Sequence, residues 1–278
     1  MAAERSARAL PPVERRARRW ASRYVAGETD DDAVRVARAL AGRGVSSSID
    51  HFGEQVTDAP TAELVGEDYC RLATRAATVG EGVWLAVDLS HLGLDVDPTA
   101  CARRLVAIAE RLPSGHRVQV GAEDSDRAPA VLACVLSAAA QGHESKLGAT
   151  IQANLHRSTD DLERLIDAGV HVRLVKGAYV EPSSRALPHG EATDAAFVRL
   201  AHRLAERDAA FALATHDQVL RDGLLDALGP RPVEQLLGVA PANLDSLVAR
   251  DVPVRVYIPY GRDWFRYWMR RLAESRGA

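Results

Sequence analysis

The sequence predicts a closed (β/α)8 barrel of the TIM type, and two observations support this fold. From residue 43 onward, short β-rich runs alternate with longer stretches of helical apolar spacing. These strand and helix units number eight, which is the number that closes a parallel barrel. An open, doubly wound sheet would show the same alternation, so only the count favours closure. No glycine fingerprint of a dinucleotide-binding fold follows the first strand.

The composition fits a soluble chain with a short extension and one large domain. Of the 278 residues, 47% are hydrophobic and 26% are charged, and no run approaches the roughly 18 apolar residues of a membrane span. The net charge of −3 gives no reason to expect a nucleic-acid partner. We expect an N-terminal helical extension at residues 1–42 and a barrel catalytic domain at residues 43–278.

Cysteine and histidine usage favours a reducing, cytoplasmic location without a metal site. The three cysteines, Cys70, Cys101 and Cys134, stand in helix-like segments and lack the spacing of a disulfide framework or metal site. The nine histidines also lack a paired, metal-binding spacing.

The N-terminal extension is expected to contain two helices. One passes through Trp20 and the other covers Asp31–Leu40, where Thr29 or Asp30 can cap its first turn. The first helix carries a basic cluster made of Arg15, Arg16, Arg18 and Arg19. We interpret this cluster as a solvated helix face, with peripheral contact at the inner face of a membrane as the alternative.

Eight strands and eight following helices make up the predicted barrel. The strands are Val45–Asp50, Val83–Leu89, Arg117–Val120, Ala149–Gln152, His171–Val175, Phe211–Thr215, Glu234–Gly238 and Pro253–Ile258. The helices lie at residues 59–79, 98–111, 126–141, 158–168, 193–207, 217–228, 241–250 and 262–276. Asp97 before Pro98 is a typical helix start, and Ser158 with Asp161 resembles a capping arrangement.

Polar residues stand where the predicted strands end, which is where barrels of this type carry their chemistry. They are Asp50, Glu54, Asp88, Glu123, Gln152, Arg173, Lys176, His216, Gln235 and Tyr257. Half-buried polar groups need partners, so the ring they form is either a binding site or an internally satisfied network. For each residue taken alone, a structural role explains it at least as well as a functional one, but together these residues outline a polar mouth.

Two specific segments resemble the proline dehydrogenase family of the monofunctional bacterial type. Arg173–Tyr179 is similar to the end of the family's fifth strand, and Tyr257–Gly261 with Tyr267–Glu274 is similar to its eighth strand and final helix. Weaker similarities follow the family order at Ile49–Glu54, Gln152–Leu155, Ala214–Asp217 and Glu234–Gln235. The resemblance implies a barrel with its final helix over the active-site mouth. It also implies FAD-dependent oxidation of L-proline to 1-pyrroline-5-carboxylate, with electrons passed to a quinone or similar acceptor.

The resemblance implies which residues contact FAD. Arg173 would lie near the isoalloxazine ring as a catalytic residue, because a fixed positive charge favours the reduced ring. Gln152 would bond the same ring edge. The remaining cofactor contacts would come from Lys176, Gly177, Ala178, Thr215 and His216.

The resemblance also implies a substrate site. Tyr179 and Tyr257 would form walls for a small saturated ring, and Tyr257 is expected to be catalytic. Arg270 and Arg271 would hold the substrate carboxylate, since guanidinium groups match its geometry, with Glu274 bracing them. The spacing of these last three residues places them on one helix face together with Tyr267.

Two positions depart from the family in the charged corner of the substrate site. Asp88 stands where the family has a lysine, and Gly121 stands where it has that lysine's aspartate partner. Of three alternatives, we favour the first, in which Asp88 pairs with Arg270 or Arg271 and the site still binds proline, but more weakly than in the family. Asp88 could instead contact a different cyclic amine, or the barrel could bind flavin without catalysis. Asn154 replaces a tyrosine and Asp217 replaces an asparagine, which are smaller changes.

Overall fold

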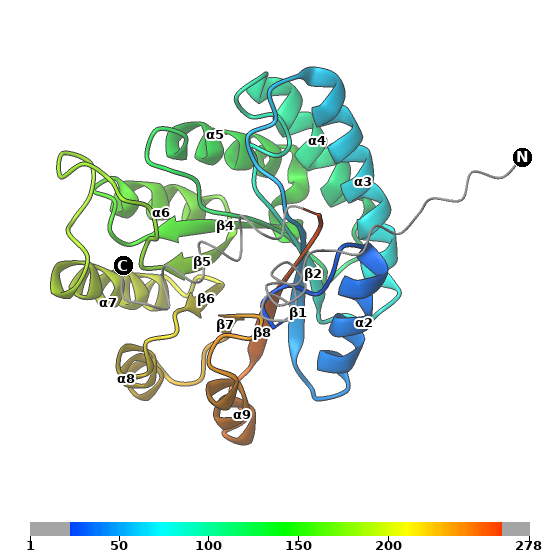
Figure 1. Cartoon of the computed structure of the whole chain (residues 1–278). Coiled ribbons are helices and arrows are strands. Elements are labelled where there is room, and N and C mark those ends of the chain that lie inside the picture. Colours follow the sequence, from blue (N-terminus) through cyan, green and yellow to red (C-terminus); the bar gives the residue numbers. More distant parts are fainter. Residues whose placement is uncertain (1–22, 263–278) are drawn as a thin grey trace, which may run out of the picture.

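The computed structural model describes residues 23–262 and confirms the closed barrel (Figure 1). Its strands pair in parallel in chain order, and the last strand pairs with the first. They are β1 (Ser46–His51), β2 (Val83–Val87), β3 (Val118–Val120), β4 (Leu147–Gln152), β5 (His171–Val175), β6 (Phe211–Ala214), β7 (Val233–Leu236) and β8 (Val254–Tyr260). Each overlaps its predicted range, so the alternation in the sequence identified the strands correctly.

Helices form the outer ring around these strands (Figure 1). They are α2 (Asp30–Ala41), α3 (Ala59–Ala77), α4 (Pro98–Arg111), α5 (Ala128–Ala138), α6 (Ser158–Asp167), α7 (Glu191–Glu206), α8 (Gln218–Leu228) and α9 (Pro241–Ala249). After α5 the chain makes a π-helical turn and a 3-10 turn over residues 139–146 before entering β4. The helices predicted through Trp20 and at residues 262–276 lie outside the described residues.

The predicted helix starts have mixed outcomes. Asp97 caps α4, because its carboxylate accepts hydrogen bonds from the backbone N–H groups of Thr99 and Ala100. The capping interpretation of Ser158 and Asp161 is wrong. The Ser158 hydroxyl donates to the carbonyl of Gln152 at the end of β4, and Asp161 pairs with Arg157.

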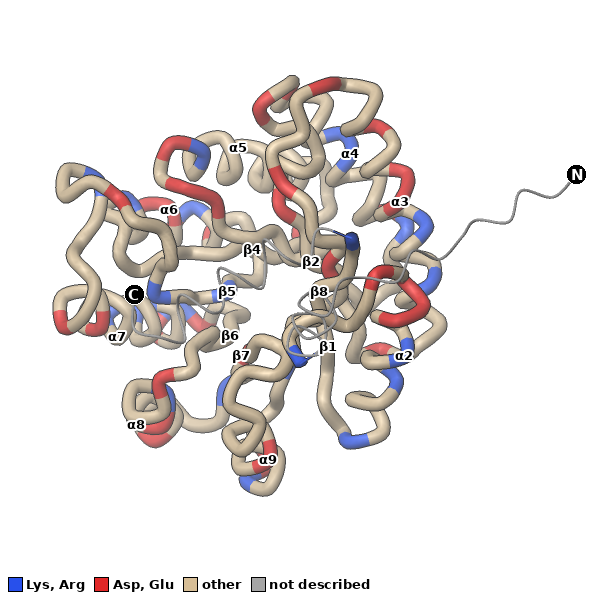
Figure 2. Tube along the Cα trace, in the orientation of Figure 1, with Lys and Arg blue, Asp and Glu red and all other residues tan. Residues whose placement is uncertain are grey.

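Helix α2 packs directly against the barrel. Thr29 caps it in a reciprocal capping box with Asp32. Its apolar face is buried in the main core, and the helix contacts both β1 and β8. Arg75 of α3 forms ion pairs with Asp30 and Asp31 in the first turn of α2. Acidic and basic residues are interspersed along the helices of the outer ring (Figure 2). The domain boundary at residue 42 stays a prediction.

The amino end of the barrel is filled by cationic and aromatic side chains. The guanidinium of Arg255 lies 3.4 Å from the centroid of the Trp84 ring, and that of Arg117 lies 5.1 Å from it. His171 meets the same ring edge-on, with centroids 5.1 Å apart. Arg255 also donates to the carbonyl of Ser47. This packing closes the end of the barrel opposite the predicted mouth.

His171 is expected to make the protein less stable in mild acid. Burial, with the charges of Arg117, Arg255 and Arg173, lowers the pKa of His171 from 6.5 to about 3. The unfolded chain therefore binds more protons than the folded chain below pH 6.5, so stability falls as the pH falls toward 3. Between pH 6.5 and pH 5, the free energy of unfolding should fall by about 2 kcal/mol less in the His171→Gln variant than in the parent protein. Urea unfolding measures this difference.

The exposed His202 provides the matched control for this measurement. The His202→Gln variant should keep the pH dependence of the parent protein. A His171→Gln variant with the same pH dependence as the parent would show that the neutral, buried imidazole does not cause the acid sensitivity.

Candidate active site

The carboxyl ends of the strands bring charged and polar side chains together at one mouth. In the parallel register, alternate residues of each strand point to the same face, and the paired positions on neighbouring strands point the same way. This alternation directs one polar set into the barrel near its carboxyl end. The set consists of Asp50, Asp88, Gln152, Arg173, Glu234 and Tyr257.

A buried ion pair crosses the barrel interior between β5 and β7. Nε of Arg173 donates to Oε2 of Glu234 at 2.6 Å, and the two residues are only 8% and 4% exposed. Nη2 of Arg173 is also buried, and it has no hydrogen-bond partner within residues 23–262. Buried donors are rarely left without a partner. The Nη2 group of Arg173 is therefore available to donate to a ligand at the mouth.

Asp50 holds two tyrosines at the first strand end. It is 3% exposed, and it accepts hydrogen bonds from the hydroxyl of Tyr69 at 2.8 Å and from the hydroxyl of Tyr257. Burial raises the pKa of Asp50, although both hydroxyl hydrogen bonds act in the opposite direction. Burial also raises the pKa of Tyr69. The arrangement fixes the hydroxyl of Tyr257, whose ring packs against Val25 and Phe52.

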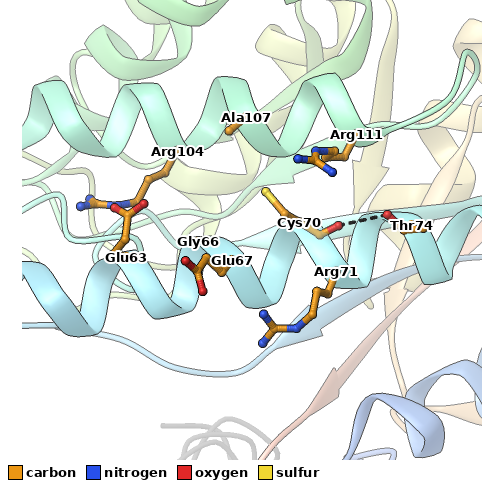
Figure 3. A pocket seen from close by; sticks show the side chains of 9 residues that line it. All are labelled: Glu63, Gly66, Glu67, Cys70, Arg71, Thr74, Arg104, Ala107 and Arg111. Carbon is orange, nitrogen blue, oxygen red and sulfur yellow. Dashed lines mark hydrogen bonds and ion pairs between the residues drawn. The ribbon is translucent and has the colours of Figure 1, made fainter.

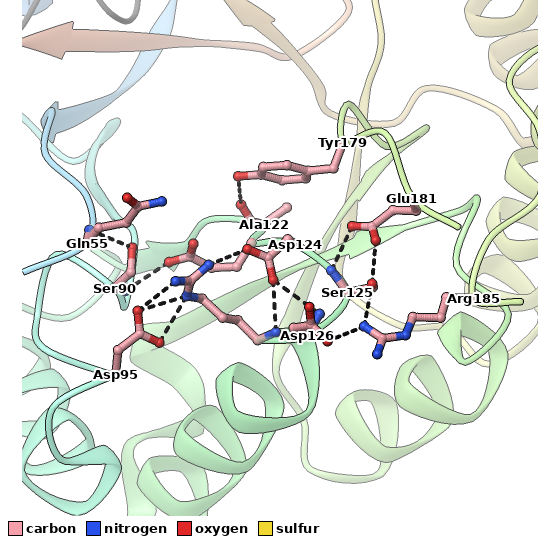
Figure 4. A network of polar contacts seen from close by, with 12 residues as sticks. Gln55, Ser90, Asp95, Ala122, Asp124, Ser125, Asp126, Tyr179, Glu181 and Arg185 are labelled. Carbon is pink, nitrogen blue, oxygen red and sulfur yellow. Dashed lines mark hydrogen bonds and ion pairs between the residues drawn. The ribbon is translucent and has the colours of Figure 1, made fainter. Parts of the chain in front are cut away.

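Gln152 and Tyr179 are both held by the loop that follows β3. Nε2 of Gln152 donates to the carbonyl of Glu123 at 2.8 Å. The Tyr179 hydroxyl donates to the carbonyl of Ala122 at 3.0 Å (Figure 4). Glu123 in turn accepts from the backbone N–H of Ser90 at 2.9 Å, and burial raises the pKa of its carboxyl group. The structure thus brings these two predicted site residues to the same anchoring loop.

Lys176 follows β5 and lies between two carboxylates. Its ammonium group is 2.6 Å from Oδ1 of Asp194 and 2.8 Å from Oδ2 of Asp217. Burial favours the neutral amine, but these two hydrogen bonds outweigh it and raise the pKa of Lys176. An ammonium group has three N–H donors, so one remains beyond the two carboxylates. Lys176 is therefore a fixed, charged group at this side of the mouth.

The residues after Lys176 bring the backbone close to the mouth. Gly177 has φ +114°, a region that favours glycine, and a Cβ at this position would overlap the amide of Asn154. Ala178 is exposed. After β6, the hydroxyl of Thr215 accepts from the backbone of Asp217, and Nε2 of His216 accepts from the backbone N–H of Leu236, both at 3.2 Å.

Asp88 and Gly121 are direct neighbours across β2 and β3. A Cβ added at Gly121 would overlap Oδ1 of Asp88. Asp88 is half-buried, so its carboxylate lies at the mouth rather than in the core. The two positions at which the sequence departs from the family are thus in contact.

Several predicted substrate residues lie outside the described part of the chain. They are Arg270, Arg271 and Glu274. Two residues that the sequence analysis did not single out are also in the site, namely Tyr69 on α3 and Asp194 on α7. Both occur within helices, where position in the chain gave no signal that they reach the strand ends.

A polar groove of about 320 Å³ lies on the outside of the barrel, between α3 and α4 (Figure 3). Its lining includes Cys70, Arg111 and an ion pair in which Arg104 is 3.0 Å from Glu63. No residue of the mouth lines it. The groove is therefore separate from the candidate active site.

Residues 23–262 contain neither a candidate membrane-spanning helix nor a candidate metal-binding cluster. None of the helices described there is long and apolar enough to cross a bilayer. Over the same residues, no three His, Cys, Asp or Glu side chains are grouped so that they could hold a metal ion.

Comparison with known proteins identifies the family. The proline dehydrogenase family model matches residues 33–278. The chain is 30% identical to "Proline dehydrogenase" of Deinococcus radiodurans, covering 95% of this chain and 90% of that protein. It is 31% identical to "Proline dehydrogenase 1" of Bacillus subtilis strain 168, covering 91% and 86%.

The fold also matches that of solved structures. Proline utilization A from Bdellovibrio bacteriovorus, inactivated by N-propargylglycine, superimposes with a TM-score of 0.85 at 20% identity. The match covers 94% of this chain but only 33% of the solved one, so the present chain spans about a third of that protein's length. The family match, the two bacterial relatives and the barrel with its polar mouth lead to one conclusion: the chain belongs to the proline dehydrogenase family.

Proposed function

We propose that this chain oxidises L-proline to 1-pyrroline-5-carboxylate, with FAD as the hydride acceptor and a quinone or similar carrier as the final acceptor. The observation that carries most weight is the buried guanidinium of Arg173, whose Nη2 has no partner within residues 23–262. Relatives that align over most of their length are named proline dehydrogenases, which supports the same reaction.

The residues at the mouth fit a flavin. Nη2 of Arg173 is a buried donor without a partner in the described chain, and a flavin ring offers acceptors for such a donor. Lys176 has one N–H beyond its two carboxylates, and Gly177 lets the backbone approach closely. We propose that Gln152, Ala178, Thr215 and His216 complete the site. FAD would supply a two-electron acceptor at flavin N5.

The substrate ring would lie between two tyrosine walls. Tyr257 is fixed by Asp50, and Tyr179 is fixed by the carbonyl of Ala122. Because both hydroxyls are already engaged, the rings present mainly apolar surface to a saturated ring. We propose that Arg270 and Arg271 hold the carboxylate and that Glu274 braces them. If proline binds as the neutral amine, the chain needs no general base for loss of hydride from the carbon next to nitrogen.

A second candidate is oxidation of a different cyclic amine. The half-buried carboxylate of Asp88 beside Gly121 favours it, because a carboxylate there repels a substrate carboxylate and attracts a cationic nitrogen or a hydroxyl. The mouth would keep its flavin contacts in either case.

Flavin reduction tests the proposal and separates the two candidates. The purified protein should be yellow, and anaerobic L-proline should bleach its flavin absorbance. Bleaching by hydroxyproline or another cyclic amine, but not by proline, would support the second candidate. A colourless protein that FAD cannot reconstitute would overturn both.

We also propose a cytoplasmic location, with peripheral contact at the inner membrane face, where a quinone is accessible, as the alternative to a solvated N-terminal helix face. The basic cluster of Arg15, Arg16, Arg18 and Arg19 motivates this contact. Co-sedimentation with anionic vesicles should depend on these arginines and weaken with salt. Equal recovery of the protein with and without vesicles would exclude the contact.

A further inference from the structure

A carboxylate just beyond Tyr179 fastens the loop after β5 to the loop after β3. Glu181 accepts two hydrogen bonds from Ser125. Its Oε1 accepts from the backbone N–H at 2.7 Å, and its Oε2 accepts from the hydroxyl (Figure 4). Ser125 is 9% exposed and Glu181 is partly buried. Hydrogen bonds to an ionised acceptor are stronger than neutral ones, and burial shields them from water.

The loop that receives Glu181 is itself held firmly from the other side. Arg127 forms ion pairs with Asp95 at 2.8 Å and with Asp124, and these tie the start of α5 to the loop before α4. Glu123 accepts from the backbone N–H of Ser90 on that same preceding loop. The carbonyl of Ala122, which receives the Tyr179 hydroxyl, therefore belongs to a rigid anchor.

The segment that carries Tyr179 has little apolar packing of its own. Val180, between Tyr179 and Glu181, is 96% exposed, and Ala178 on the other side is also exposed. The hydrogen bond from Tyr179 to Ala122 is a neutral one and only partly buried. An exposed loop without apolar burial is readily displaced. The charged, two-point contact of Glu181 therefore restrains this segment more strongly than the neutral hydrogen bond from Tyr179 to Ala122 does.

An outer contact lies beside this one but is more exposed. Arg185 donates to the hydroxyl of Ser125 at 3.2 Å and pairs with Asp126. The side chains of that pair are 47% and 77% exposed, so water and salt screen it. Arg185 therefore provides a matched control from the same loop.

We propose that Glu181 is a positioning residue that holds Tyr179 over the mouth through Ser125, and so sets the affinity for the substrate. This inference rests on the proposed function, in which Tyr179 forms one wall of the substrate site. Glu181 touches neither Arg173 nor Lys176 in any hydrogen bond or ion pair described for residues 23–262, so its removal should affect substrate binding more than the flavin.

The Glu181→Gln variant tests the inference with little change in size. The amide lacks the negative charge and cannot accept both Ser125 hydrogen bonds through two carboxylate oxygens. In steady-state kinetics of the FAD-loaded enzyme, KM for proline should rise by about tenfold, since one weakened charged hydrogen bond is worth roughly that factor. The kcat and the flavin content should stay within about twofold of the parent. The Arg185→Gln variant should leave KM within about twofold.

A double-mutant cycle asks whether Glu181 acts through Tyr179. In a Tyr179→Ala background, the Glu181→Gln change should have no further effect on KM, because the side chain that it positions is absent. A rise of the same size in both backgrounds, or a fall in kcat and flavin content with unchanged KM, would overturn the proposal.

Hydrogen exchange keeps the proposal testable if the parent protein does not oxidise proline. The Glu181→Gln variant should exchange faster than the parent over residues 177–185 and at the Ser125 amide, whereas the Arg185→Gln variant should match the parent. Unchanged exchange in Glu181→Gln would overturn the positioning role. If the parent protein is inactive but the Glu181→Gln variant exchanges faster, the proposed function is rejected. The role of Glu181 in holding the Tyr179 segment through Ser125 is then retained.

Discussion

Replacing Arg173 with methionine is expected to lower the free energy of unfolding by about 3–5 kcal/mol. The change leaves the carboxylate of Glu234, which is 4% exposed, without its 2.6 Å partner inside the barrel. Arg255 lies opposite Glu234 in the pairing of β7 with β8, and its charge should keep the loss near the lower end of that range. Urea unfolding of the flavin-free protein measures the effect.

The matched control removes both members of the pair. The Arg173→Met and Glu234→Leu double variant should recover most of the lost stability, because replacing a whole buried ion pair with apolar side chains is often nearly neutral. The single and the double variant should both bind FAD poorly, since both lack the Nη2 donor of Arg173. A single variant as stable as the parent would contradict the role of the pair. Full FAD affinity in the double variant would contradict the assignment of Arg173 to the cofactor.

The fold could be predicted because its signal is local and repeated. Each strand, such as Val83–Val87, is a short β-rich run followed by a polar or glycine break and a helical stretch, and this pattern needs no knowledge of long-range contacts. Ser158 shows where local reasoning fails. Its position in the sequence suits a helix cap, but α6 already begins at Ser158, so Arg157 is at the N-cap and the Ser158 hydroxyl donates to the carbonyl of Gln152 on the preceding strand.

The site could be predicted as a set of positions but not as a set of pairs. Strand ends and the family resemblance pointed to Arg173 and Lys176, because barrels direct such residues to one mouth. The partner of Arg173 is Glu234, which is 61 residues away in the chain. Likewise, Tyr69 and Asp194 reach the site from helices. Only the closed barrel determines such contacts, since no spacing rule relates residues on distant strands and helices.

Gly121 and Asp88 are expected to behave as a coupled pair. Gly121→Asp alone should weaken both stability and proline binding, because its Cβ would overlap Oδ1 of Asp88 and its carboxylate would add a like charge. Two like charges about 4 Å apart cost roughly 1–4 kcal/mol, depending on their exposure to water. Thermal unfolding and the KM for proline measure the two effects.

The Asp88→Lys and Gly121→Asp double variant is expected to bind proline more tightly than the parent, by about fivefold or more. The parent pair sums to −1, from Asp88 at −1 and glycine at 0, whereas lysine with aspartate sums to 0, so the corner gains one positive charge. At about 4 Å, one unit charge is worth roughly 1–4 kcal/mol, and 1.4 kcal/mol corresponds to tenfold in affinity. The dependence of flavin reduction on proline concentration measures the change.

The Asp88→Asn variant separates charge from geometry, since it also brings the sum to 0 without adding an ion pair. If Asp88 competes with the substrate carboxylate for Arg270 and Arg271, the asparagine variant should gain much of the same affinity. The double variant should exceed it only if the lysine contacts the carboxylate directly. Proline binding that is unchanged in both variants would place the substrate carboxylate away from Asp88. That result would favour contact between the Asp88 carboxylate and a different cyclic amine.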